Sequence, residues 1–186
     1  MGTDSLLADK HRSFELQALP HLNAAYNLAR WLTRSPAEAD DVVQEAMLRA
    51  FRAFDDLRGK DAKPWLLAIV RNCFLTSARA ARDRKIIPLP ERDGETDDAL
   101  VDTGANPEQA AIRADQRRKL NHVIGGLPEE FREVLILREM EDLSYQAIAQ
   151  VTAAPIGTVM SRLARARALL KSEWEREVEG ARNGVR

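Results

Sequence analysis

The stretch from Ile86 to Gln109 constrains the fold of this chain more than any other feature. It holds seven acidic residues against a single base, Arg92, together with three prolines and two glycines, and it shows no helical period. This composition is typical of solvated, irregular chain. The sequence therefore predicts two separate bodies of roughly 85 and roughly 75 residues, each large enough for a small helical bundle.

Both bodies are expected to be helical. Of the 186 residues, 45% are hydrophobic but only 5% are aromatic, and the helix formers Ala, Leu, Arg and Glu recur throughout. β-Branched runs, which strands favour, are scarce. The predicted fold class is all-α, with two small helical domains (1–85 and 107–186) joined by an acidic flexible linker (86–106).

Several classes of protein are disfavoured. No apolar run approaches the roughly 20 residues that cross a bilayer, and no leader-like segment opens the chain, so a cytoplasmic protein is expected. The single cysteine, Cys73, excludes an internal disulfide, and His11, His21 and His122 stand too far apart for a local metal motif. No metal and no cofactor is expected. The net charge of −1 averages segments of opposite sign, so charge has to be read locally.

In the first body, Ser35 and Pro36 form a predicted N-cap and first turn of a helix that runs to about Phe54. Its core stripe is Val43, Met47, Ala50, Phe51 and Phe54. The opposite face mixes acids with the aliphatic residues Val42 and Leu48. Such a face fits a protein docking surface, but contact with a neighbouring element of the same chain explains the two aliphatics equally well.

A further helix is predicted from about Pro64. Its first turns are apolar almost all round, and its end carries a basic string broken only by Asp83. Together with the polar loop before Trp65, this string could hold single-stranded DNA, with the loop taking an unstacked base. By itself the pattern is weak evidence, because Trp65 fits a core position better than a stacking platform.

The second body contains a predicted helix-turn-helix, in which the short helix YQAIAQV is capped by Ser144 and followed by a four-residue break. A long helix then runs from about Ile156 to Val178. The outward face of that helix centres on Ser161, Ala164 and Ala168, with arginines beside them and no acid between Ile156 and Lys171. Small residues allow a close approach to DNA while arginines reach bases and phosphates. A merely solvated basic helix is the alternative.

Three segments carry a resemblance to a known family: AEADDVVQEAMLRAFRAF (37–54), KPWLLAIVRNCF (63–74) and the run from Leu127 to Lys171, which includes GTVMSRLARAR. In this order, with an acidic linker between them, they resemble the extracytoplasmic-function (ECF) sigma factors, the compact branch of the sigma-70 family of bacterial RNA polymerase. The resemblance covers about four-fifths of the chain.

The resemblance implies a role for each face. The first body would be sigma region 2, the second would be region 4, and the linker would thread through the polymerase toward its RNA exit channel. Docking on the clamp helices of the largest polymerase subunit would use Asp41, Val42, Gln44, Glu45 and Leu48. Recognition and melting of the minus-10 element would use Lys63, Trp65, Arg71, Asn72, Arg79 and Arg82. Recognition of the minus-35 element would use Thr158, Ser161, Arg162 and Arg165.

The implied partners are bacterial core RNA polymerase, promoter DNA and an anti-sigma factor, and the protein would associate with the nucleoid when bound to polymerase. Met160 departs from the family pattern, since many relatives have a base there, so no relative's promoter sequence can be transferred. Two other interpretations remain at this point. A free-standing helix-turn-helix regulator would bind duplex operator DNA unaided, and a helical adaptor would bind an acidic partner without DNA. An enzyme is the least favoured, because no catalytic constellation can be assembled.

Overall fold

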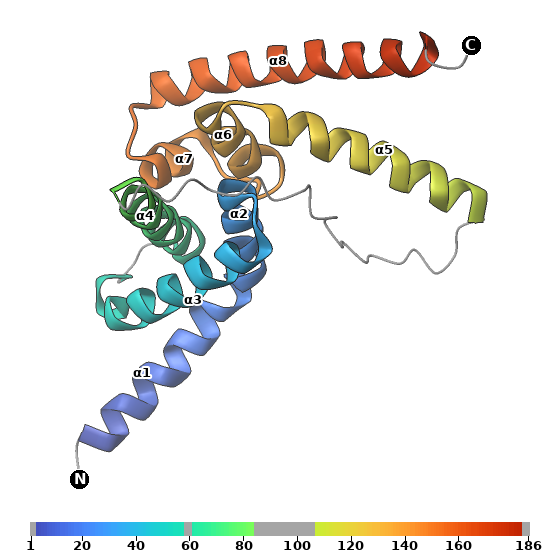
Figure 1. Ribbon diagram of the computed structural model, residues 1–186. Helices are drawn as coiled ribbons and strands as arrows, with labels where there is room; N and C mark the ends of the chain where they lie inside the picture. The colour runs from blue at the N-terminus through green and yellow to red at the C-terminus, as the bar shows by residue number, and fades with distance from the viewer. Residues whose placement is uncertain (1–2, 58–60, 84–106, 184–186) are drawn as a thin grey trace.

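The computed structural model describes residues 3–57, 61–83 and 107–183, and this part of the chain consists of helices joined by short turns, with no strand. The predicted all-α class is confirmed. Figure 1 shows the arrangement of the helices. They are α1 (Thr3–Gln17), η1 (Leu19–His21), α2 (Leu22–Thr33), α3 (Pro36–Arg52), η2 (Phe54–Leu57), α4 (Ala62–Asp83), α5 (Pro107–Gly126), α6 (Glu129–Glu139), α7 (Tyr145–Thr152) and α8 (Ile156–Asn183), where η marks a short 3-10 helix.

The two predicted serine caps are confirmed. The Ser35 hydroxyl accepts a hydrogen bond from the backbone N–H of Glu38 at 3.3 Å, with Pro36 in the first turn of α3. The Ser144 hydroxyl accepts one from the backbone N–H of Ala147 at 3.1 Å, at the start of α7. Each bond satisfies a backbone donor that the first helical turn leaves unpaired, so the helix start is set locally.

Helices α2, α3 and α4 pack against one another and form the core of the first body. Their fully buried side chains include Leu28, Leu66, Leu67 and Val70. Helix α1 extends away from this cluster (Figure 1), and its C-terminal part joins the core through Phe14. The sequence did not predict α1, whose apolar residues show little helical periodicity.

In the second body, α6 packs on both α7 and α8, and α7 also packs on α8. The turn between α7 and α8 begins at Ala153, which has the left-handed backbone angle φ of 50°. This geometry ends α7 and allows α8 to start at Ile156, which completes the predicted helix-turn-helix. Helices α5 and α8 both extend beyond the packed helices to the same side of the molecule (Figure 1), and α8 runs five residues past its predicted end.

The two bodies are in contact, which the sequence did not predict. Helix α2 packs on α6, and α4 packs on α7. Two ion pairs also cross this interface, between Lys63 and Glu141 at 2.9 Å and between Arg71 and Glu133 at 2.5 Å. The predicted linker, residues 86–106, lies outside the described residues.

Candidate functional site

The outward face of α3 carries four of the five residues expected to contact a protein partner. Successive helical residues are rotated by about 100°, which places Asp41, Gln44, Glu45 and Leu48 on one face. Leu48 is 50% exposed, and the Glu45 carboxylate accepts a hydrogen bond from the Arg49 guanidinium at 2.6 Å. That bond raises the pKa of Arg49 above its ordinary value. An exposed apolar side chain beside carboxylates is thus a real feature of this face.

The expectation that Val42 is exposed on this face is wrong. Val42 is only 5% exposed and belongs to the core, with Ala39, Ala46 and Ala50 on the same side of α3. The physical reason is that α3 is flanked by both α2 and α4, so its buried arc is wider than the stripe that one partner helix would cover. For Val42, the alternative of contact within the chain is therefore confirmed.

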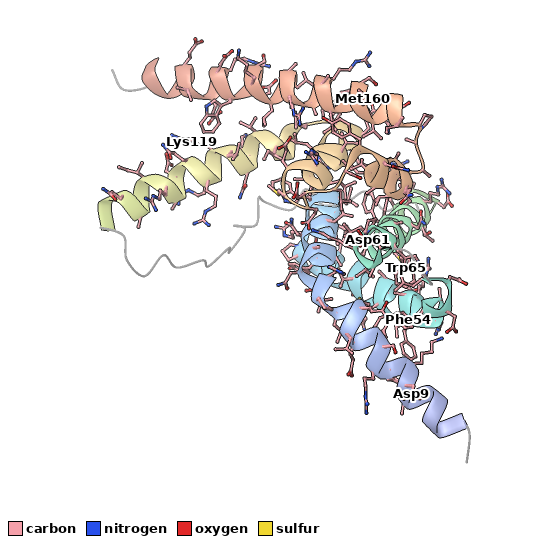
Figure 2. The ribbon with its side chains drawn as sticks, turned by 180° about the vertical axis from the view of Figure 1, so that it is seen from behind. Asp9, Phe54, Asp61, Trp65, Lys119 and Met160 are labelled. Atoms are coloured by element: carbon pink, nitrogen blue, oxygen red, sulfur yellow. The ribbon has the colours of Figure 1, made fainter. Side chains whose placement is uncertain are left out.

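The residues expected on α4 divide between two of its faces. Trp65, Asn72 and Arg79 are seven residues apart and form one stripe along the helix, on which Asn72 and Arg79 are exposed. Arg82 is also exposed, in the last turn. Trp65 is half-buried against Phe54, with ring centroids 6.5 Å apart in an edge-to-face arrangement. Figure 2 labels Trp65, at the start of α4, and Phe54, at the start of η2. The Trp65 ring thus packs on the core and still borders the surface.

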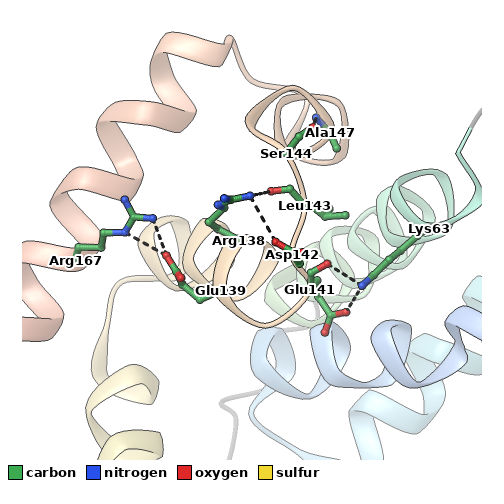
Figure 3. A network of polar contacts seen from close by, with 9 residues as sticks. All are labelled: Lys63, Arg138, Glu139, Glu141, Asp142, Leu143, Ser144, Ala147 and Arg167. Atoms are coloured by element: carbon green, nitrogen blue, oxygen red, sulfur yellow. Dashed lines mark hydrogen bonds and ion pairs between the residues drawn. The ribbon is translucent and has the colours of Figure 1, made fainter.

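Lys63 and Arg71 lie instead on the face of α4 that meets the second body. The Lys63 ammonium group donates to the backbone carbonyl of Glu141 at 2.7 Å and also pairs with its carboxylate, as Figure 3 shows. The same carboxylate accepts a hydrogen bond from Asn27 of α2 at 2.6 Å. Glu141 therefore receives donors from two helices of the first body, although its side chain is only 6% exposed.

Arg71 donates to the Glu133 carboxylate in the middle of α6. Burial raises the pKa of Glu133 above its ordinary value, and the nearby positive charge of Arg71 partly offsets this effect. A buried carboxylate of this kind needs its cationic partner, because an unpaired charge in the interior is costly. In this structure the Arg71 guanidinium is occupied by a contact within the chain.

The start of α8 presents the surface expected to meet DNA. Ala164, Ser161 and Arg165 are exposed and follow one another around the helix in this order. Arg165 forms no ion pair with another described residue. Thr158 is half-buried, and its carbonyl accepts a hydrogen bond from the Ser161 hydroxyl at 2.9 Å. A helix with small residues and a free guanidinium can enter a major groove and reach base edges.

Arg162 lies at the edge of this face. Its guanidinium pairs with the Glu130 carboxylate of α6 at 2.9 Å, and its side chain is largely covered. On the opposite edge of α8, Arg167 donates to Glu139 at 2.7 Å (Figure 3). Both arginines brace α8 against α6, so Arg165 is better placed than either of them to approach a base.

Sequence reasoning missed the buried polar residues of α6. Arg132 is only 5% exposed and donates to the carbonyls of Gly125 and Leu127, each at 2.9 Å. Burial lowers the pKa of this guanidinium below its ordinary value. The side chain satisfies carbonyls at the end of α5 and in the turn that follows it. The charged pair Arg132 and Glu133 stands between the apolar residues Phe131 and Val134, and this is the only sequence signal that could have indicated this role.

Other parts of the described chain offer no competing site. Cys73 is buried, and burial raises the pKa of its thiol. Within residues 3–57, 61–83 and 107–183, no cluster of three or more His, Cys, Asp or Glu side chains is arranged to hold a metal ion. The helices in these ranges include none that is both long and apolar enough to span a bilayer.

Comparison of the sequence with known families gives two matches. Residues 19–84 match sigma-70 region 2, and residues 117–170 match sigma-70 region 4. The chain is 36% identical over 161 residues to the RNA polymerase sigma-H factor of Pseudomonas aeruginosa, which covers 84% of this chain and 83% of that protein. It is 32% identical over 174 residues to the ECF RNA polymerase sigma-E factor of Escherichia coli, covering 89% and 91%.

Solved structures show the same fold at lower identity. The sigma factor RpoE of Bartonella quintana, solved with the anti-sigma factor NepR, matches with a TM-score of 0.67 and 23% identity, over 88% of this chain and 98% of that chain. CnrH, solved with the cytosolic domain of CnrY, matches with a TM-score of 0.59 and 24% identity, over 87% of each chain.

These relatives match along both bodies, whereas a free-standing helix-turn-helix regulator would explain the second body alone. The function they support is promoter-specific initiation of transcription. The chain therefore belongs to the sigma-70 family of RNA polymerase sigma factors, in its extracytoplasmic-function branch.

Proposed function

We propose that this sigma factor binds bacterial core RNA polymerase through α3 and places its two bodies on separate promoter elements. In this division, residues 1–85 dock on the polymerase and recognise the minus-10 element, residues 86–106 link the bodies, and residues 107–186 recognise the minus-35 element. One observation carries the proposal. A single chain presents both an exposed acidic and apolar face on α3 and an exposed face of small and basic residues on α8.

The docking face consists of Asp41, Gln44, Glu45 and Leu48. Leu48 supplies an exposed apolar contact, and the surrounding carboxylates favour a basic partner surface. Val42 supports this face from inside, since it packs in the core beneath it.

At the minus-10 element, the exposed stripe of Asn72 and Arg79, with Arg82 beside it, is available for single-stranded DNA, and Trp65 borders it. Lys63 and Arg71 are held by Glu141 and Glu133 in this structure. Lys63 and Arg71 can therefore contact the promoter only if the two bodies separate first. Separation would also allow the two bodies to bind promoter elements that lie apart.

At the minus-35 element, α8 enters the major groove with Ser161 and Arg165 toward the bases. Thr158 lies beside them, and Arg162 reaches a phosphate or stays paired with Glu130. In this arrangement Arg165→Ala should cost about 1 to 3 kcal/mol of discrimination between correct and altered minus-35 sequences. The factor itself catalyses no reaction.

An anti-sigma factor is the proposed regulator. Both solved structures named above are complexes: RpoE is a sigma factor bound to the anti-sigma factor NepR, and CnrH is bound to the cytosolic domain of CnrY. A similar partner would cover the polymerase-binding surface of this chain. The proposed location is the cytoplasm, with association to the nucleoid while the factor is bound to polymerase.

The test is transcription from a library of genome fragments, with and without purified bacterial core RNA polymerase. Specific transcripts should start only when both proteins are present, and the chain alone should bind duplex DNA poorly. Tight, specific binding of duplex by the chain alone, with no effect of polymerase, would show that the roles assigned to the first body are wrong.

One variant on each surface, with a control for the first, tests the two roles separately. Leu48→Asp should weaken binding to core polymerase, whereas Leu16→Asp, at the more exposed Leu16 on α1, should not. Arg165→Ala should change the choice among promoters without changing polymerase binding. If Arg165→Ala lowers transcription equally from all promoters, the guanidinium contacts phosphate rather than a base.

A further inference from the structure

Two apolar side chains project from the first turns of α8 without a place in the core. Ile156 is 50% exposed and Met160 is 53% exposed, and they stand four residues apart on the same side of the helix. Figure 2 shows Met160 near the start of α8. The buried stripe of these turns consists of Val159 and Leu163 and does not include them.

Ile156 and Met160 lie on the surface of α8 that is proposed to contact DNA. In a helix-turn-helix, the N-terminal residues of the second helix contact base edges in the major groove. At about 100° per residue, Met160 lies at one edge of the outward face of α8 and Arg165 on the other side of its centre, with the small residue Ala164 between them. A helix seated on this small central residue would bring both edges to the groove floor.

The chemistry of the major groove leaves few partners for an exposed thioether. Guanine, cytosine and adenine present hydrogen-bonding groups there, whereas thymine also presents the apolar 5-methyl group. Methionine has no hydrogen-bond donor, and its flexible apolar side chain adapts to irregular apolar surfaces. Burial of both groups against each other removes apolar area from water, which is favourable.

We infer that Met160, supported by Ile156, is a specificity-determining residue that reads the 5-methyl group of a thymine in the minus-35 element. This inference rests on the proposed function and adds the kind of base that one edge of α8 selects. Arg165 on the other edge is suited to guanine, so the two edges would select different bases of one element.

The experiment removes the methyl group from DNA and the thioether from the protein in turn. The minus-35 element is first taken from the transcripts that the wild-type protein and core polymerase produce together. Each thymine in it is then replaced singly by deoxyuridine, which lacks only the 5-methyl group. Transcription is measured with the wild type, Met160→Ala, Arg165→Ala and Val178→Ala, the last altering an exposed apolar residue far along α8.

The expected result is a three- to fivefold loss for the wild type at one or two uracil positions, about the size that burial of one methyl group gives. Met160→Ala should lose the same factor on the thymine template and show no further loss with uracil. Arg165→Ala and Val178→Ala should keep the wild-type response to uracil at those positions.

Three results would overturn the inference. They are a selected element without thymine, a wild type insensitive to every uracil, and a Met160→Ala protein as sensitive to uracil as the wild type. If Met160→Ala weakens transcription equally on all templates, and neither the wild type nor any variant responds to uracil, the Met160 side chain contacts a protein instead of thymine. Absence of any polymerase-dependent transcript would instead refute the proposed function, and the inference with it.

Discussion

The substitution Arg71→Met tests the contact between the two bodies most directly. It removes the cation that pairs with Glu133 across the interface while keeping an unbranched apolar stem of similar length. The Glu133 side chain is only 6% exposed, so water cannot take the place of the guanidinium. The variant must therefore either bury an unpaired carboxylate or bind a proton.

Protonation of Glu133 sets the upper limit of the free energy of unfolding that Arg71→Met can lose. A carboxyl group with an ordinary pKa of 4.5 takes up a proton at pH 7 at a cost of about 3.4 kcal/mol, and at pH 5 at a cost of only about 0.7 kcal/mol. This limit is close to the roughly 3 to 5 kcal/mol typical of breaking a buried ion pair. Arg71→Met should thus lower the free energy of unfolding by up to about 3 kcal/mol at pH 7 and by under 1 kcal/mol at pH 5.

The sign of the pH dependence follows from burial, which raises the pKa of Glu133 in the folded state. Above pH 4.5 the unfolded chain has released a proton that the folded variant still holds, so the free energy of unfolding falls as pH rises. The stabilisation that the protonated Glu133 side chain contributes is complete below pH 4.5 and is lost as pH rises through the pKa of the folded state. Without Arg71, which lowers that pKa in the wild type, the loss extends to higher pH.

The assay is urea unfolding followed by circular dichroism at pH 5, 6 and 7. Glu133→Gln serves as the matched control, because the amide has nearly the same shape and does not titrate. The double variant Arg71→Met/Glu133→Gln should be more stable at pH 7 than Arg71→Met alone and should lose the added pH dependence. A loss of the same size at pH 5 and pH 7, or no loss at all, would refute the buried ion pair between the two bodies.

Three other outcomes are expected. Arg132→Leu removes the donors to the carbonyls of Gly125 and Leu127 and should lower the free energy of unfolding by about 2 to 4 kcal/mol in urea unfolding; an unchanged midpoint would contradict this role. Ala153→Gly relieves the left-handed φ of 50° and should add about 0.5 to 1 kcal/mol, seen as a raised thermal midpoint. Leu48→Asp should weaken binding to core polymerase about tenfold in fluorescence anisotropy, and wild-type affinity in a folded variant would remove α3 from the docking surface.

Much of the local structure could be predicted because its signals lie within a few residues. The helix predicted from Pro36 to about Phe54 runs from Pro36 to Arg52, and both serine caps form as expected. The helix-turn-helix was likewise recognisable, since a short capped helix, a break and a longer basic helix follow one another in the chain. Helix α1 was missed because its apolar residues repeat only weakly at the helical period.

The sequence predicted which residues of the candidate site lie on the outward faces better than it predicted which other residues contact them. Leu48 and Arg165 are exposed as expected, because each stands opposite the apolar stripe of its own helix. Val42 is buried because two helices rather than one cover α3. Arg71 is paired across 62 residues of sequence, and no local pattern could indicate that partner.

The sequence by itself determined where the capped helices α3 and α7 begin, which stripe of each is apolar, and where charge gathers along the chain, because these properties depend on caps and on contacts between residues three or four apart. Only the tertiary structure decided how wide each buried face is and which charged groups meet across the two bodies. Those outcomes depend on which helices pack together, and packing joins residues that are far apart in the chain. For this sigma factor, the residues on each outward face follow from the local sequence. Whether that face is exposed or covered depends on how the helices pack.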